Sequence, residues 1–201
     1  MKGRAWTLAA LGLALTALGG CGGGAAPTAR TGIPAALLRE ARPIGSGRRF
    51  HPSVRGPVIG PCRPRLGPRR GVHIELFAAN RVVVLGAGIG VRGPVSREAG
   101  RIARARCYGA LVTLEPTGVV LVRPGARLML ADVFRAWGEP LSRRRAASFR
   151  APANDPVRVF VAGRLRPGPP GSVPLVAHSE IVVETGPRVP PHTSYTFPPR
   201  T

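Results

Sequence analysis

Residues able to do acid–base or metal chemistry are few in this sequence, which holds four histidines and nine acidic residues among 201. His73 begins a predicted strand and His178 precedes another, but no carboxylate or thiol stands at the spacing of a known metal motif from either. No G-x-S-x-G, S-x-x-K or H-E-x-x-H sequence occurs. Glu115, in a predicted turn, is the acidic residue that we single out for a test. We therefore expect no catalytic residue, no metal site and no cofactor.

The first 21 residues end in a cysteine whose surroundings suit lipid attachment. Lys2 and Arg4 precede an apolar stretch, residues 5–18, that is shorter than the roughly 20 residues needed to cross a bilayer. The sequence Leu18-Gly19-Gly20-Cys21 resembles the lipobox of bacterial lipoproteins. This resemblance implies cleavage before Cys21 and a diacylglyceryl group on its sulfur, which would anchor the protein to the outer face of the cell membrane. An ordinary secretory signal, with Cys21 incidental, is the alternative.

Cys62 and Cys107 remain as an even pair once Cys21 is lipidated. An exported protein meets an oxidising compartment, so we predict a disulfide between them. The closed loop of about 45 residues would contribute roughly 3–4 kcal/mol in the chain-entropy model. Two free buried thiols are the alternative.

Glycines after residue 85 imitate a dinucleotide-binding turn. Gly88, Gly90 and Gly93 satisfy G-x-G-x-x-G, but Pro94 and the Gly- and Arg-rich sequence behind it supply no helix N-terminus for a pyrophosphate. We interpret the segment as a connection that leaves a hairpin.

Arginine dominates the charge of the chain. Lys2 is the single lysine among 30 basic residues, and the formal net charge is +21. Arg143, Arg144 and Arg145 form a triplet that could contact an anionic polymer or lipid. Arginine, alanine, glycine and proline share GC-rich codons, so solvated surface under codon bias is the interpretation that we favour. Aromatic residues are not interleaved with the cations, and no specific nucleic-acid binding is predicted.

The chain divides into three parts. Residues 1–20 are the predicted lipoprotein signal peptide, residues 21–70 a lipidated Gly/Pro/Arg-rich tether, and residues 71–201 a β-rich globular domain. The tether is predicted because it holds few large apolar residues with which to offset backbone ordering.

Strand and turn patterns organise the domain. Two hairpins are predicted, over 72–85 and 111–122, the second with a turn at Glu115-Pro116-Thr117-Gly118; residues 86–106 are predicted as a loop. Leu130, Val133, Phe134 and Trp137 share one face of a helix, and two strands follow near 157–161 and 180–184. This order predicts an α+β fold, a β-grasp-like mixed sheet with one helix that is preceded by an extra hairpin. A β-sandwich is the alternative.

Several segments of residues 60–201 resemble a group of uncharacterised exported bacterial lipoproteins. The resemblance is carried by 72–77 with 86–91, by Cys107 with 114–118, and by 133–141, 174–178 and 195–198. The wider group carries His-Thr-His-Asp in the second hairpin, where this chain has Val112-Thr113-Leu114-Glu115. The resemblance therefore implies no metal role and no established activity.

These observations favour a membrane-anchored envelope lipoprotein that is a non-enzymatic binding or structural module. Its expected partner is the lipid bilayer, through Cys21; an anionic envelope polymer is a further candidate, and the oligomeric state is left open. One alternative is an electrostatic binder of anionic polymers or lipids. The other is an enzyme or degenerate metal-binding domain that uses Glu115, His73 or His178.

Overall fold

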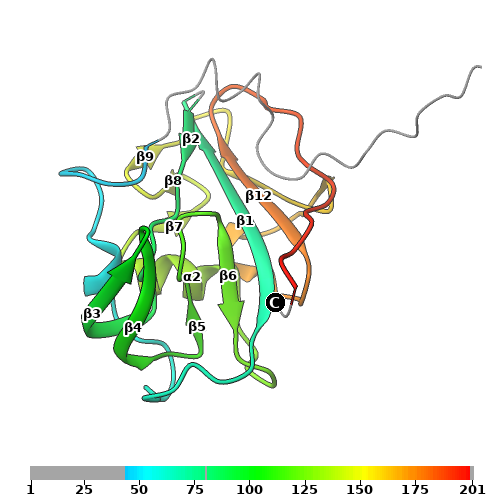
Figure 1. Ribbon diagram of the computed structural model, residues 1–201. Coiled ribbons are helices and arrows are strands. Elements are labelled where there is room, and N and C mark those ends of the chain that lie inside the picture. Colours follow the sequence, from blue (N-terminus) through cyan, green and yellow to red (C-terminus); the bar gives the residue numbers. More distant parts are fainter. Residues whose placement is uncertain (1–43, 80, 200–201) are drawn as a thin grey trace, which may run out of the picture.

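The computed structural model describes residues 44–79 and 81–199; the predicted signal peptide and Cys21 lie outside them. Within these residues one α-helix accompanies three β-sheets (Figure 1). The largest sheet contains β1 (Arg70–Ala78), β2 (Arg81–Val83), β5 (Leu111–Val112), β6 (Val119–Val122), β10 (Arg158–Val161), β11 (Arg164–Leu165) and β12 (Glu180–Thr185). Its strand order is β11-β10-β12-β1-β6-β5, with β2 also paired to β1.

The centre of this sheet is mixed. β1 and β12 run parallel, whereas β6 and β10, their outer neighbours, run antiparallel to them. The order β6-β1-β12-β10 is that of a β-grasp sheet, so the predicted α+β fold with a mixed sheet is confirmed in place of the sandwich. The hairpin predicted to precede the sheet is instead part of it, because β1 is a central strand and β2 pairs with β1. All residues of β1 after Arg70 are buried, as expected for a strand covered on both faces.

The helix α2 (Leu130–Trp137) forms as predicted and covers one face of the sheet. Its apolar stripe is fully buried with the inward side chains of β1 and β12 in one core cluster. The Asp132 carboxylate accepts a hydrogen bond from the Met129 N–H at 2.8 Å, which satisfies one free donor of the first turn. Gly138, at φ 83°, ends the helix in the left-handed conformation.

The prediction of a loop over 86–106 is wrong. Most of this segment forms the hairpin β3 (Val91–Glu98) and β4 (Arg101–Tyr108), a separate two-stranded sheet. Its inward side chains include Val91 and Ile102, and arginines occupy many of the exposed positions. The segment has few apolar residues in alternation, and Gly93 and Pro94 interrupt them. The sequence pattern therefore did not predict these two strands.

Short elements complete the domain. A third sheet contains β7 (Leu141–Ser142), β8 (Arg145–Ala146) and β9 (Phe149–Arg150), and two 3-10 turns lie at Ser53–Arg55 and Pro170–Ser172.

Residues 44–69, predicted as part of the tether, lie against the domain. The Phe50 ring is buried and stacks on Trp137 with the ring centroids 5.9 Å apart. Ile44 forms a β-bridge to Val83, and Arg63 forms one to Tyr108. The packed body of the protein therefore begins well before residue 71, because a few apolar residues in this Pro- and Gly-rich segment dock on a surface formed by residues far along the chain.

The predicted disulfide between Cys62 and Cys107 is present, with the Cα atoms 5.3 Å apart. It joins the segment before β1 to the end of β4. No helix among the described residues is long and apolar enough to cross a membrane.

Candidate functional site

A cluster of buried polar side chains lies on the face of the sheet opposite α2. Successive side chains of a strand alternate between faces, so Val72 and Ile74 enter the helix-side core while His73 and Glu75 point to the other side. Glu180 of β12 stands directly opposite His73 in the parallel register. The three side chains of the cluster, His73, Glu75 and Glu180, are each less than 5% exposed.

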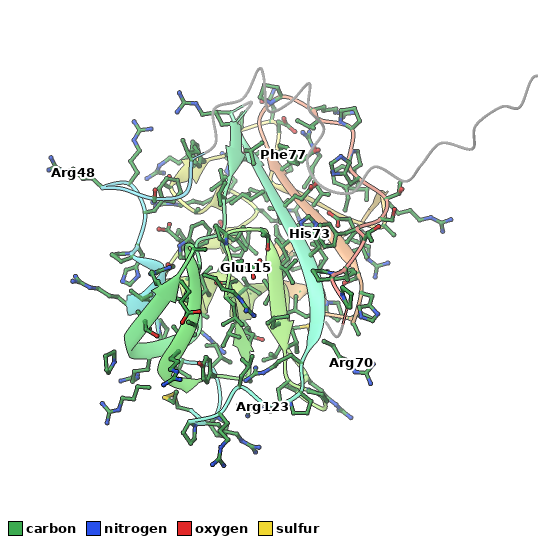
Figure 2. The ribbon with its side chains drawn as sticks, in the orientation of Figure 1. Arg48, Arg70, His73, Phe77, Glu115 and Arg123 are labelled. Carbon is green, nitrogen blue, oxygen red and sulfur yellow. A yellow bond between two sulfur atoms is a disulfide. The ribbon has the colours of Figure 1, made fainter. Side chains whose placement is uncertain are left out.

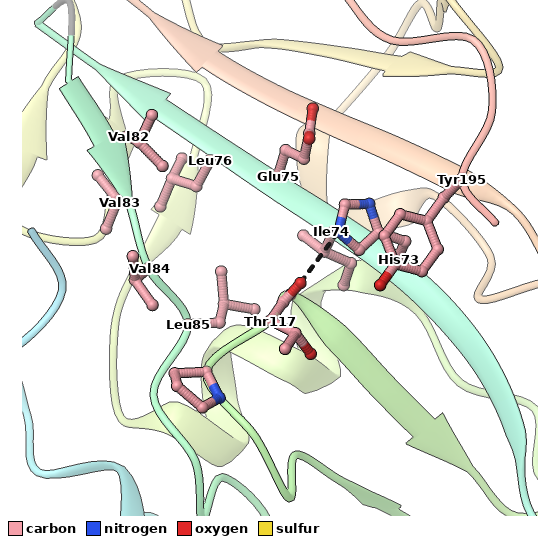
Figure 3. Close-up of a pocket in the computed structure, with 12 residues that line it drawn as sticks. His73, Ile74, Glu75, Leu76, Val82, Val83, Val84, Leu85, Thr117 and Tyr195 are labelled. Carbon is pink, nitrogen blue, oxygen red and sulfur yellow. Dashed lines mark hydrogen bonds between the residues drawn. The ribbon is translucent and has the colours of Figure 1, made fainter. Parts of the chain in front are cut away.

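His73 is held by contacts on both ring nitrogens. Its Nδ1 lies 2.6 Å from Glu180 Oε2, and its Nε2 lies 3.0 Å from the carbonyl oxygen of Thr117 (Figure 3). A carbonyl oxygen can only accept a hydrogen bond, so Nε2 carries the proton and donates it. The other ring nitrogen, Nδ1, faces the Glu180 carboxylate.

The predicted turn before β6 positions Thr117. Gly118 adopts φ +80°, and a Cβ atom there would lie 2.6 Å from the Ile74 carbonyl oxygen and 2.9 Å from His73 Nε2. Glycine is required both by the backbone conformation and by the close approach of the turn to β1. The Gly118 carbonyl also accepts a hydrogen bond from the Ile74 N–H at 2.9 Å.

Glu75 is paired with a histidine of the C-terminal segment. The His192 Nδ1 lies 2.9 and 2.8 Å from the two carboxylate oxygens of Glu75. Burial and the neighbouring Glu180 carboxylate raise the pKa of Glu75, and His192 and His73 oppose this in part. The site therefore holds two carboxylates that repel each other away from water.

The C-terminal segment, residues 186–199, covers this cluster as it runs back along β12 (Figure 1). The Tyr195 ring stacks on His73 with the centroids 3.8 Å apart and the planes within 10° (Figure 3). Phe197 in turn packs edge-on against Tyr195. Burial, Glu180 and Glu115 raise the pKa of the Tyr195 hydroxyl.

An open pocket of about 240 Å³ adjoins the cluster. It lies where β2 and β6 diverge along the same edge of β1, and it is lined by His73, Glu75, Tyr195, residues 82–85 and the turn 116–118 (Figure 3). Aliphatic side chains thus form one wall and the polar cluster the other, an arrangement typical of small-ligand sites.

A second buried acid stands further along the same face. The Glu184 carboxylate lies 3.5 Å from Arg158 Nε, and Arg158 also pairs with Asp155 at 2.5 Å. Burial raises the pKa of Glu184, and the nearby Arg158 only partly opposes the effect.

The other residues singled out from the sequence lie outside the cluster. Glu115 pairs with Arg101 at 2.9 Å and is half exposed, which favours a structural role. His178 precedes β12 and packs near Phe197, with the ring centroids 5.1 Å apart. Arg143 and Arg144 are exposed in the turn between β7 and β8, and Arg145 is exposed at the start of β8. Arg144 and Arg145 donate to the backbone carbonyls of Ala153 and Ala147.

The sequence reasoning missed Glu75, Glu180, His192 and Tyr195. The expectation that no carboxylate accompanies His73 is wrong, since Glu75 stands two residues away on the same strand face. That spacing was visible in the sequence and is a recognisable signal. The partnership with Glu180 was not visible, because it depends on strand register.

Comparison of the chain with protein-family models, curated proteins and solved structures found no significant match. The resemblance to exported bacterial lipoproteins therefore stays a prediction.

Proposed function

We propose that this chain is a lipoprotein of the bacterial cell envelope whose folded domain is a non-enzymatic binding module held at the outer face of the membrane. The Cys62–Cys107 disulfide is the observation that carries the proposal. It accounts for two of the three cysteines and leaves Cys21, the residue of the lipobox-like sequence, for acylation. Disulfides persist mainly in oxidising compartments outside the cytosol, which supports export.

The assignment of binding rather than catalysis rests on the cluster. His73 and Glu75 each have fixed partners, and the C-terminal segment packs over them. Such fixed, buried groups suit the holding of a small ligand in the adjoining pocket. We propose that the module binds its small ligand in this pocket.

The anchoring is tested by feeding labelled palmitate to a bacterial host that produces the chain. We expect label in the wild-type protein and in a Cys62→Ser/Cys107→Ser control, and none in Cys21→Ser, which should also leave the membrane fraction. Label that persists in Cys21→Ser would overturn the proposal, because the anchor would then be elsewhere.

A second candidate function, contact with anionic polymers, is favoured by a group of arginines distinct from 143–145. Arg69 is buried and donates to the carbonyls of Gly109 and Ala110, and burial together with Arg123 and Arg63 lowers its pKa to about 10. Among the described residues, no acidic side chain forms an ion pair with these three arginines. Arg123 lies at the same end of the molecule as Arg70 (Figure 2). This unbalanced positive end could receive a phosphate or carboxylate group.

A further inference from the structure

We propose that His73, Glu75 and Glu180 bind one divalent transition-metal ion of the zinc class. This deepens the proposed binding function by naming its ligand, and it rests on that function for its place in the envelope but not for its chemistry.

The three side chains already have the spacing of a ligand set. One ring nitrogen of His73 and one oxygen from each carboxylate all lie within 4.8 Å of one another. Metal–ligand bonds to imidazole nitrogen and carboxylate oxygen are about 2.0–2.2 Å long, so ligand atoms around one ion stand about 3–4 Å apart. Small side-chain rotations are enough to close the site.

The hydrogen bond to Thr117 points independently to a ligand at His73. It fixes the ring with Nε2 protonated and leaves Nδ1 directed at Glu180. Histidine ligands commonly donate their second ring N–H to a carbonyl or carboxylate, which sets the tautomer and the ring orientation. At Nδ1 the ring already faces the carboxylate of Glu180, the second proposed ligand, at 2.6 Å.

The two buried carboxylates of the site suit a cation. Glu75 and Glu180 are both buried, and Glu180 Oε1 has no hydrogen-bond partner among the described residues. Buried carboxylates without full compensation are costly. A single divalent ion would balance both carboxylates at once.

The donor set selects the class of ion. One imidazole and two carboxylates, without a thiolate, suit zinc and other borderline divalent metals rather than copper(I) or the all-oxygen sites of calcium. Three protein ligands leave a coordination position open, and two of them, His73 and Glu75, line the pocket. His192, which contacts both oxygens of Glu75, acts as a positioning residue for that ligand.

The test uses the membrane-extracted protein in detergent, with its disulfide intact and its metal removed by a chelator. Calorimetric titration with Zn²⁺ should give one saturable site. We expect His73→Gln and Glu180→Gln to weaken binding by at least about 100-fold, and His192→Gln by about 10–100-fold, as for other supporting residues. His178→Gln, which alters a histidine outside the cluster, is the matched control and should bind like the wild type.

Two results would overturn the proposal: no saturable binding, or binding that survives in both His73→Gln and Glu180→Gln. If circular dichroism shows that a variant is unfolded, a measurement on the wild-type chain tests the site instead. Co²⁺ should then give visible absorption that one equivalent of Zn²⁺ abolishes, and the absence of such absorption contradicts the site. The intact mass of the same sample reports acylation of Cys21, so a failure of metal binding and a failure of anchoring are separate results.

Discussion

His73 joins three parts of the protein that are distant in the sequence. Its ring contacts Glu180 of β12, the Thr117 carbonyl in the turn before β6, and Tyr195 of the C-terminal segment. These contacts leave the ring one orientation. A histidine fixed in this way is prepared for a ligand at Nδ1, since no further ordering is needed when the ligand arrives.

Glu184 shows how the buried acidic face should respond to pH. Its carboxyl faces two arginines, Arg158 and Arg188. Arg158 also forms an ion pair with Asp155. Burial raises its pKa above the unfolded value of about 4.5, so the folded chain holds the proton more tightly than the unfolded chain. The contribution of Glu184 to stability is thus full below that value and is lost as pH rises through the folded pKa.

Replacing Glu184 by Gln should therefore lessen the fall in unfolding free energy between about pH 5 and pH 7. Urea unfolding at the two pH values measures this difference. Glu98→Gln, at the exposed tip of β3, is the control and should keep the wild-type slope. Equal slopes for Glu184→Gln and the wild type would show that burial of this acid has no such cost.

The residues of the site differ in how far they could be predicted. His73 was placed on a strand, and Glu75 could have been added from the alternation of that strand. Glu180 is 107 residues from His73, and His192 is 117 from Glu75. Those pairings depend on the parallel register of β1 and β12 and on the path of the C-terminal segment, which no local pattern specifies.

At the scale of elements, the sheet was predictable where apolar alternation is strong. The second hairpin, α2 and the strands β10 and β12 follow their sequence patterns. The β3–β4 hairpin was missed because arginines, Gly93 and Pro94 dilute its pattern, and the docking of residues 44–69 was missed because it depends on tertiary contacts such as Phe50 with Trp137.

The turn before β6 is the element on which the position of His73 depends most. Gly118→Ala would force a side chain into the left-handed conformation and against the Ile74 carbonyl and the His73 ring. We expect a loss of at least about 1 kcal/mol in unfolding free energy. Chemical denaturation measures this loss, and the His73 ring resonances in NMR should shift with it.

Gly125→Ala is the matched control, because Gly125 also has positive φ but a Cβ atom added there would have no other atom within 4 Å. This substitution should lower the unfolding free energy only by the strain of the left-handed backbone conformation, and it should leave the His73 resonances unshifted. Identical effects of the two substitutions would show that the close approach of Gly118 to His73 is unimportant.

The disulfide links the segment before β1 to β4. Its closed loop, with a sequence separation of 45, should stabilise the fold by roughly 3–4 kcal/mol. We expect reductant to lower the thermal midpoint of the wild-type protein and to leave that of Cys62→Ser/Cys107→Ser unchanged. If the wild-type midpoint is insensitive to full reduction, the segment is held by its packing instead.

At the scale of the whole molecule, the charge of +21 is spread over many arginines. The arrangement of these arginines decides whether the protein has a site for an anionic polymer. Burial and the positive charge of Arg63 lower the pKa of Arg123. Arg144 and Arg145 donate to backbone carbonyls, as Arg69 and Arg123 also do. The difference is that Arg69 is buried and has two arginines, Arg63 and Arg123, beside it.

If the end that bears Arg63 is a polyanion site, Arg63→Gln/Arg123→Gln should elute from heparin at lower salt than the wild type. Arg143→Gln/Arg145→Gln removes the same charge and should shift elution less. Equal shifts would mean that retention follows net charge alone, as non-specific electrostatics predicts.

The central claim is that a lipid anchored at Cys21 holds this disulfide-linked, metal-binding domain at the membrane. Intact mass spectrometry of the protein extracted from bacterial membranes, under native conditions, tests it most directly. We predict a chain that begins at Cys21, carries a diacylglyceryl group, lacks the hydrogens lost in one disulfide and retains one divalent metal ion. A metal-free chain without lipid would contradict the account.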